Sequence, residues 1–351
     1  MDRVSFRNDY SEGAHPRLLE ALVSASAEQN AGYGLDRHSV RAAQLIRARF
    51  GCAGADVHFL SGGTQANLLA ISSFLRPHQA AIAAHTGHIA THETGAIEAT
   101  GHKVLTVPGD GGKLSPALVE PVLREHGDEH MVQPSLVYVS DSTEVGTLYS
   151  RAELQALSVF CRDNGLLLFL DGARLGAALT AEGNDLAPAD IAACCDAFYI
   201  GATKNGALAG EALVVCNPAL QADLRYQIKQ RGAMLAKGMF LGVQFEALFE
   251  GDLFFELARH ANAMAARLRE ALSAQGIAFL ADSPTNQLFP ILPASVVETL
   301  ETRYEFHRWQ AMPDGGIAIR LVTSWATAPE AVEAFIADAD TALAGEGPTC
   351  C

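Results

Sequence analysis

The chain is poor in basic residues and contains no long apolar run. It has 351 residues, with 25 Lys and Arg against 40 Asp and Glu, and a formal net charge of −15. This balance argues against nucleic acid or an anionic membrane as a partner, because both attract basic surfaces. No uninterrupted apolar stretch reaches the roughly 18–20 residues that a membrane-spanning helix needs. A phosphate ligand would therefore be held locally, by backbone N–H groups and a few placed cations.

Cysteine shows no pattern that would indicate a disulfide framework. The seven cysteines are odd in number and mostly scattered through apolar sequence, which is typical of reduced thiols in a cytoplasm. The first residues do not resemble a secretory signal, so we expect a cytoplasmic protein. Cys194 and Cys195 are expected to pack in the core. For Cys350 and Cys351, a solvated tail is favoured over a lipidation signal, and their role is left open.

Short apolar runs alternate with helical segments through the first two thirds of the chain. Helices are expected between the runs, including one that begins at a capping box on Ser150 and ends near Gly165. This alternation predicts an α/β fold with a mainly parallel sheet sandwiched by helices. The runs predicted as strands are residues 57–60, 80–84, 103–107, 136–140, 166–170, 197–200 and 212–216.

The pattern changes beyond about Phe245. A long helical stretch over residues 253–275 precedes short strands near residues 287–291 and 317–322. We therefore predict an N-terminal arm and a large domain over residues 1–245, followed by a small C-terminal α+β domain over residues 246–351 with a short flexible tail.

Two of the predicted strands lead into charged residues. The run at 166–170 ends at Asp171, and the run at 197–200 is followed by Lys204 among small residues. Ligands of parallel sheets bind outside the carboxyl ends of the strands. A lysine amine and a carboxylate at one such edge suit pyridoxal phosphate, since the amine forms a Schiff base and the carboxylate keeps the pyridine nitrogen protonated. The alternatives are an exposed loop lysine, and a helix cap or a salt bridge with Arg174 for the aspartate.

A glycine-containing turn offers a place for a phosphate. Residues 61–64 follow a predicted strand and open a helix, where free N–H groups bind anions. Gly63 allows close approach of the backbone, and Thr64 could add its hydroxyl. The alternative is an ordinary tight turn. The glycines at residues 109–112 match no phosphate-binding motif and predict a surface turn.

Three histidines stand close together in the sequence. His85, His88 and His92 could share one helix face and bind zinc, but Gly87 interrupts that face and no cysteine or HExxH pattern accompanies them. We therefore predict no metal site. A core or surface role is favoured for at least two of these histidines, and one imidazole could stack on a cofactor ring.

Arg320 lies inside the apolar run at residues 317–322. A buried arginine needs an anionic partner. A substrate carboxylate would serve, because guanidinium and carboxylate groups form paired hydrogen bonds. A structural salt bridge is equally open.

In this order, the motifs resemble the low-specificity L-threonine aldolases, in the β-eliminating lyase group of the aspartate-aminotransferase-like fold (fold type I). The resemblance covers most of the chain, and its most specific pieces are residues 63–67, residues 171–174 and the context of Lys204. It implies a pyridoxal-phosphate-dependent carbon–carbon lyase that cleaves L-threonine or related β-hydroxy-α-amino acids to glycine and an aldehyde. It also implies a homodimer or homotetramer with active sites at the subunit interface.

The resemblance assigns cofactor contacts to matching residues. Lys204 would carry the cofactor, Asp171 would meet the pyridine nitrogen and His88 would stack on the ring. The full set of implied cofactor-binding residues is Gly63, Thr64, His88, Asp171, Arg174 and Lys204.

The substrate contacts follow the family with two departures. Arg174 and Arg320 would bind the substrate carboxylate, and Tyr33 would come from the neighbouring subunit. Asn8 stands where many members carry a serine that contacts the carboxylate. Glu144 stands where many aldolases place a histidine near the β-hydroxyl, so either His88 or Glu144 could act as the base.

The change at Glu144 leaves other reactions open. A β-eliminating lyase acting on a β-substituted amino acid is the first alternative, and an aminotransferase is the second. A non-catalytic scaffold and a metal-dependent hydrolase using the three histidines are alternatives from other classes.

Overall fold

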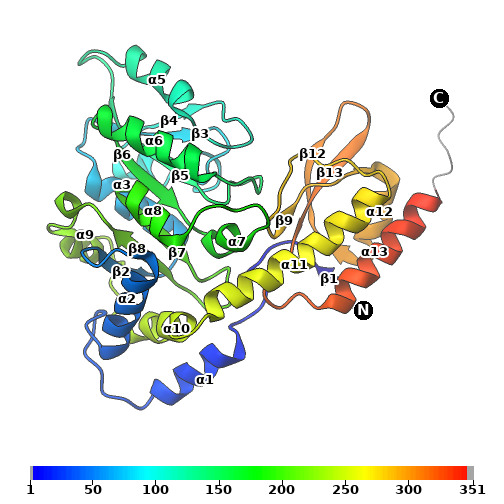
Figure 1. The fold of residues 1–351 in the computed structure, drawn as a ribbon, viewed down its shortest axis with the longest axis horizontal. Coiled ribbons are helices and arrows are strands. Elements are labelled where there is room, and N and C mark those ends of the chain that lie inside the picture. Colours follow the sequence, from blue (N-terminus) through cyan, green and yellow to red (C-terminus); the bar gives the residue numbers. More distant parts are fainter. Residues whose placement is uncertain (1–2, 346–351) are drawn as a thin grey trace.

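The structure is a computed structural model that describes residues 3–345, and its largest element is a seven-stranded sheet (Figure 1). The strand order is β2-β8-β7-β6-β5-β3-β4. All pairs among β3 to β7 are parallel, whereas β8 runs antiparallel to β2 and β7. The prediction of a mainly parallel sheet is confirmed. The strands are β2 (Asp56–Leu60), β3 (Gln79–Ala84), β4 (Val104–Val107), β5 (Gln133–Ser140), β6 (Leu167–Asp171), β7 (Ala197–Gly201) and β8 (Glu211–Val215).

Both faces of this sheet are buried. Leu168 and Leu170 of β6 pack into one hydrophobic cluster, and Phe169 between them packs into a second. Successive side chains of a strand point to opposite faces, so an apolar run without polar interruption builds two cores. The helices that cover the faces and edges are α1 (Pro16–Ala25), α2 (Arg37–Phe50), α3 (Gly63–Phe74), α4 (His88–Thr91), α5 (Pro116–Glu125), α6 (Arg151–Asp163), α7 (Leu175–Thr180), α8 (Pro188–Cys194), α9 (Leu224–Gln230) and α10 (Met239–Phe249), with 3-10 turns at Glu98–Thr100 and Pro218–Leu220.

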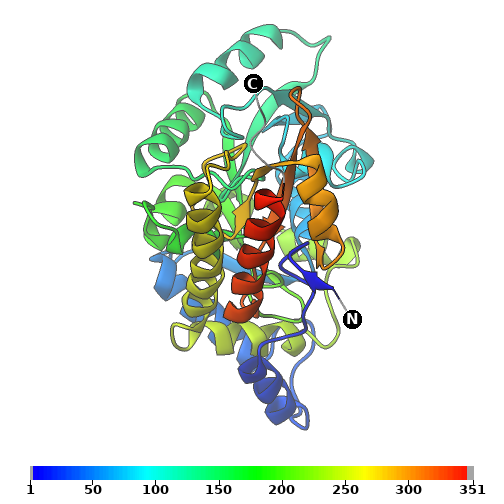
Figure 2. The same cartoon turned by 90° about the vertical axis from the view of Figure 1, so that its right-hand side faces the viewer.

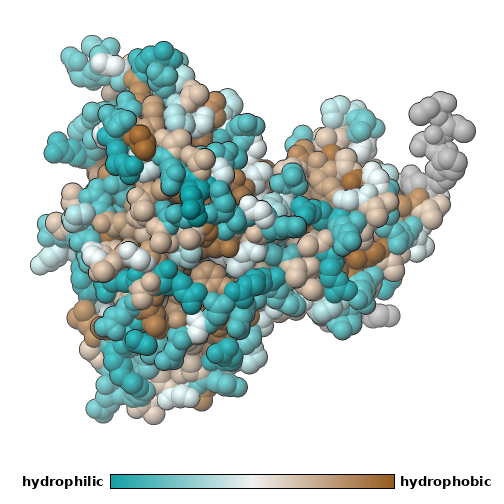
Figure 3. Space-filling model, viewed as in Figure 1, coloured by the Kyte–Doolittle hydropathy of each residue, from teal (hydrophilic) through white to brown (hydrophobic). Residues whose placement is uncertain are grey.

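A second, smaller group of elements packs around a third hydrophobic cluster, beyond the long helix α11 (Leu253–Ala274) (Figures 1 and 2). In it β13 pairs antiparallel with β9, β10 and β12, while β1 from the N-terminal arm pairs parallel with β11. Figure 3 shows a notch between the two masses at the top of the molecule. The remaining elements are β1 (Val4–Ser5), β9 (Gln287–Leu288), β10 (Ile291–Pro293), α12 (Ala294–Glu301), β11 (Tyr304–Glu305), β12 (His307–Ala311), β13 (Gly316–Val322) and α13 (Pro329–Ala344).

The sequence also predicts a domain boundary and the surroundings of four cysteines. The division after residue 245 stays a prediction, and Cys350 and Cys351 lie outside the described residues. Cys195 is buried in the first cluster and Cys194 packs at its edge, as expected. Within residues 3–345, no helix is both long enough and apolar enough to cross a bilayer.

Candidate active site

A cavity of about 270 Å³ opens at the carboxyl ends of the parallel strands. It is lined by segments that follow β2, β3, β5, β6 and β7, and by the first residue of β8, which meets the same edge because β8 runs in the opposite direction. A second cavity of about 390 Å³ extends from it toward β12 and β13. The two share five lining residues, which are Tyr10, His88, Glu144, Arg174 and Lys204.

Asp171 is the last residue of β6 and lies at the base of the first cavity. Its carboxylate accepts hydrogen bonds from the Tyr138 hydroxyl at 2.5 Å, the Tyr199 hydroxyl at 2.5 Å, the Asn67 amide at 3.0 Å and the Ala173 backbone at 3.0 Å. Burial would raise the pKa of Asp171, but the nearby His88 and these hydrogen bonds outweigh it and lower the pKa. Asp171 is therefore held as a carboxylate although it is buried.

Lys204 follows β7 and lines both cavities, so the structure brings it together with Asp171 as the strand order predicts. Burial lowers the pKa of Lys204, and the positive charge of Arg174 lowers it further. A partly buried lysine of lowered pKa loses its proton more readily than an exposed one, which suits it to act as a nucleophile. The alternative of an exposed loop lysine is wrong, because Lys204 is not exposed.

The N-terminus of α3 forms one wall of the first cavity. Gly62, the N-cap residue, offers no side-chain hydrogen bond, so the first N–H groups of the helix have no side-chain cap. A side chain at Gly63 would place its Cβ 3.0 Å from the Tyr199 hydroxyl, so the close packing there favours glycine. The start of this uncapped, twelve-residue helix places N–H groups and Thr64 at the cavity, an arrangement that suits an anion, and the predicted phosphate contact stays a prediction.

His88 and Glu144 line the same two cavities as Lys204. The Nδ1 atom of His88 lies 2.7 Å from the Oε1 atom of Glu93, and its backbone N–H donates to Glu144 at 2.8 Å. Burial raises the pKa of the Glu144 carboxyl. Both residues line both cavities, so either is placed to exchange a proton with a ligand there.

The other two histidines do not join His88 in a cluster of ligands. His85 is exposed and faces the backbone of Gly109, whereas His92 lines the second cavity. In the part of the chain that the structure describes, no group of three or more His, Cys, Asp or Glu side chains is arranged to hold a metal ion.

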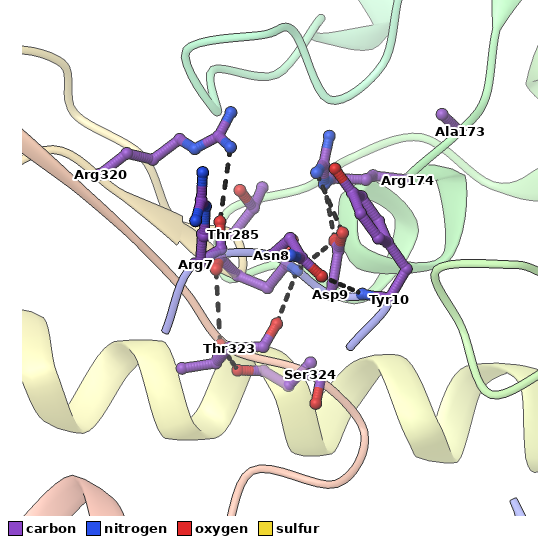
Figure 4. A network of polar contacts seen from close by, with 12 residues as sticks. Arg7, Asn8, Asp9, Tyr10, Ala173, Arg174, Thr285, Arg320, Thr323 and Ser324 are labelled. Carbon is purple, nitrogen blue, oxygen red and sulfur yellow. Dashed lines mark hydrogen bonds and ion pairs between the residues drawn. The ribbon is translucent and has the colours of Figure 1, made fainter. Parts of the chain in front are cut away.

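Arg174 is already paired. Its Nε and Nη2 atoms donate to the two oxygens of Asp9 at 2.7 and 3.0 Å (Figure 4). Asn286 donates to the same carboxylate. The predicted alternative of a salt bridge between Asp171 and Arg174 is therefore wrong. Asn8 uses its Oδ1 atom locally, as an acceptor for the Tyr10 backbone and the Ser11 hydroxyl.

The guanidinium of Arg320 keeps hydrogen-bond donors free for a ligand. Its Nη2 atom reaches only the Arg7 carbonyl at 3.5 Å, and its Nε atom is buried without a partner. Its guanidinium carbon lies 5.3 Å from the centre of the Trp309 ring. Within residues 3–345 Arg320 makes no ion pair, so the alternative of a structural salt bridge is wrong, and its charge faces the second cavity unpaired.

Tyr33 lies elsewhere. It borders a separate hollow beside α9, its ring contacts Lys229 at 4.6 Å, and its backbone has a φ of 63°. Tyr33 lines neither cavity of the candidate site, and its predicted role in a neighbouring subunit stays a prediction.

Sequence reasoning missed several residues of the site. Glu211 opens β8, is buried and accepts a hydrogen bond from Thr203, and burial raises the pKa of its carboxyl. A charged residue directly before the apolar run at 212–216 was the available signal. Asp9, Asn67 and Tyr138 gave no such signal, because their partners are remote in sequence.

The comparisons with known proteins agree with the geometry. A family model described as Beta-eliminating lyase matches residues 6–294. The low specificity L-threonine aldolase of Pseudomonas sp. (strain NCIMB 10558) is 33% identical over 338 residues, covering 95% of this chain and 96% of that protein. The enzyme of that name from Saccharomyces cerevisiae is 28% identical over 82% of this chain and 74% of its own length.

Solved structures give the same result. A structure of Leishmania major threonine aldolase has a TM-score of 0.96 and 50% identity, covering 97% of this chain and 99% of that one. An aspartate aminotransferase of Thermus thermophilus has a TM-score of 0.72 at 18% identity, over 96% of this chain and 91% of its own, which shows the shared fold.

Proposed function

Because the chain belongs to the beta-eliminating lyase family, we propose that it is a pyridoxal-phosphate-dependent lyase that cleaves L-threonine or related β-hydroxy-α-amino acids to glycine and an aldehyde. The observation that carries the proposal is one cavity that holds an ionised Asp171 and a Lys204 of lowered pKa, with Arg320 in its extension making no ion pair among residues 3–345. The similarity to L-threonine aldolases supports aldol cleavage over the β-elimination and transamination alternatives.

The residues of the cavity fit pyridoxal phosphate. A carboxylate held ionised by four hydrogen-bond donors suits a protonated pyridine nitrogen, and an uncapped helix N-terminus suits a phosphate. Asp171, Lys204 and His88 would hold the ring, and Gly63 and Thr64 the phosphate. When bound, the cofactor withdraws electrons from the α-carbon of the substrate.

The arginines orient the substrate. Arg320 has free donors facing the cavity, so it is placed to take the α-carboxylate in a paired interaction. Arg174 uses two of its nitrogens on Asp9, which leaves Nη1 for the substrate. Asp9 thus fixes the direction of Arg174.

Cleavage requires a base for the β-hydroxyl proton. Glu144 stands where many aldolases place a histidine, and burial raises the pKa of its carboxyl, which makes the carboxylate a stronger base. His88 is the other candidate, because it lines the same cavities. Either group could act directly or through a water molecule.

The assembly and the compartment are parts of the same proposal. We propose a homodimer or homotetramer in a cytoplasm, with Tyr33 reaching the site of a neighbouring subunit. Exposed apolar side chains on and between the first two helices support a subunit contact there, and they are Leu19, Val23, Tyr33, Leu35 and Val40.

Product analysis tests the proposed reaction. The protein incubated with pyridoxal phosphate and L-threonine should release glycine and acetaldehyde, whereas 2-oxobutyrate with ammonia would show elimination instead. Lys204→Ala should abolish turnover and the visible absorbance band of the bound cofactor, because the attachment point is lost. The matched control is Lys103→Ala at an exposed position. A Lys204→Ala variant that keeps both band and turnover would contradict the assignment.

A further inference from the structure

Seven residues around the first cavity form one closed circuit of polar contacts. The contact between the histidine and Glu144 uses the histidine backbone N–H, and all the others join side chains. In order around the circuit, they are His88, Glu93, Asn67, Asp171, Tyr138, Ser140 and Glu144. The circuit thus includes the carboxylate proposed to meet the pyridine nitrogen and both candidate bases, together with residues that have no assigned role.

Asn67 joins two buried carboxylates. Its Nδ2 atom lies 2.7 Å from Glu93 Oε1 and 3.0 Å from Asp171 Oδ2, and the residue is fully buried. The two hydrogens of the amide are therefore divided between the two acids. The opposite amide orientation would set a carbonyl oxygen against two carboxylate oxygens, so the contacts fix which end of the amide faces them. Asn67 holds Glu93 at a set position relative to Asp171.

Glu93 acts on His88. Its side chain is completely buried, and its Oε1 atom accepts from His88 Nδ1 at 2.7 Å. An ionised carboxylate can only accept, so Nδ1 carries the proton and Nε2 is left as the acceptor of the neutral ring. Among residues 3–345, Glu93 does not line either cavity, whereas His88 lines both. Glu93 therefore reaches a ligand only through His88.

We propose that Glu93 is a positioning residue that fixes the Nδ1–H tautomer of His88 and so leaves Nε2 free to accept a proton. Asn67 holds Glu93 in place. The inference deepens the proposed function and rests on it for its catalytic meaning. A carboxylate at Nδ1 cannot donate to it, so its replacement by an amide should release the choice of tautomer.

Histidine NMR tests the inference without relying on turnover. In the full-length protein labelled with ¹⁵N-histidine, the His88 signals are assigned by their loss in His88→Asn. We expect a protonated Nδ1 and an unprotonated Nε2 in the neutral ring. In Glu93→Gln a share of the neutral ring should change to the Nε2–H tautomer, because an amide can donate to Nδ1 as well as accept from it. The matched control is Glu98→Gln, which removes the same charge at an exposed position nearby and should leave His88 unchanged.

The kinetic arm uses the enzyme loaded with cofactor. In Glu93→Gln kcat for L-threonine should fall by about tenfold or more, whereas KM should change much less. Glu93→Asp should restore part of the loss.

An Nε2–H tautomer in the wild-type protein would overturn the inference even if Glu93→Gln did not fold. An unchanged Nδ1–H tautomer in a folded Glu93→Gln would overturn it as well. A wild-type protein that releases no glycine would refute the proposed function, but the tautomer would still decide this inference.

Discussion

At the scale of single residues, the ion pair between Asp9 and Arg174 fixes a guanidinium at the wall of the cavity. Both side chains are largely buried, at 1% and 14% exposure, and two hydrogen bonds join them. Removing one partner of such a pair leaves an uncompensated buried charge, which costs about 3–5 kcal/mol. We expect Asp9→Asn to lower the free energy of unfolding by that order and to raise KM for L-threonine, because Arg174 loses its fixed direction. Denaturant unfolding and steady-state kinetics would measure the two effects. Asp110→Asn, in an exposed turn, serves as the control, and an unchanged KM would contradict the positioning role.

Sequence reasoning found the site residues that stand at the ends of apolar runs. Asp171 and Lys204 could be predicted because buried strands of a parallel sheet end at one edge, so chain order alone brings the two together. Asp9 could not be assigned to Arg174, because 165 positions separate them in sequence. Asn67 is likewise 104 positions from Asp171. Only tertiary packing selects such partners, and no periodicity in the chain records it.

At the scale of elements, a histidine joins α2 to its neighbours. His38 places Nδ1 2.5 Å from Glu246 of α10 and Nε2 2.8 Å from Glu28 in the segment before α2. Both nitrogens face carboxylates, so both carry protons. Burial would lower the pKa of His38, but the two carboxylates outweigh it and raise the pKa above its ordinary value of 6.5.

This arrangement predicts a pH-dependent contribution to stability. A group whose pKa is raised on folding stabilises fully below its unfolded value, and that contribution is lost as the pH rises through the folded value. We therefore expect His38→Gln to lower the unfolding temperature most below pH 6.5, and less as the pH rises above it. Thermal unfolding across this range measures the difference, with the exposed His130→Gln as the control. A difference that does not change with pH would contradict the interpretation.

The elements with a strong local signal were predicted, and those without one were not. The Ser150 capping box is present at the start of α6, and the predicted turn at residues 109–113 closes with a bridge between Asp110 and Lys113. The strand β12 was missed because its residues are largely exposed and show no apolar alternation. Its place is set by pairing with the buried β13.

At the scale of the whole molecule, the N-terminal arm connects the smaller group of elements to the active site. β1 pairs with β11, Phe6 is fully buried in the third hydrophobic cluster, and Asp9 binds Arg174. Further along, the His15 backbone donates to Gly206 in the segment of Lys204. Loss of packing at one point of this arm should therefore reach the cavity.

Phe6→Ala tests this connection. Phe6 packs against Tyr304 and Phe335, so its truncation should cost about 3–5 kcal/mol of stability by leaving a cavity among them. Because Asp9 lies three residues further along, we also expect a higher KM for L-threonine at a temperature where the variant remains folded. Unfolding by denaturant and kinetics on the same preparation separate the two effects. Val4→Ala, at an exposed position of the same arm, should change neither by much. A destabilised Phe6→Ala with wild-type KM would mean that the arm supports the fold without positioning Asp9, and that Arg174 is held by its own surroundings in the larger mass.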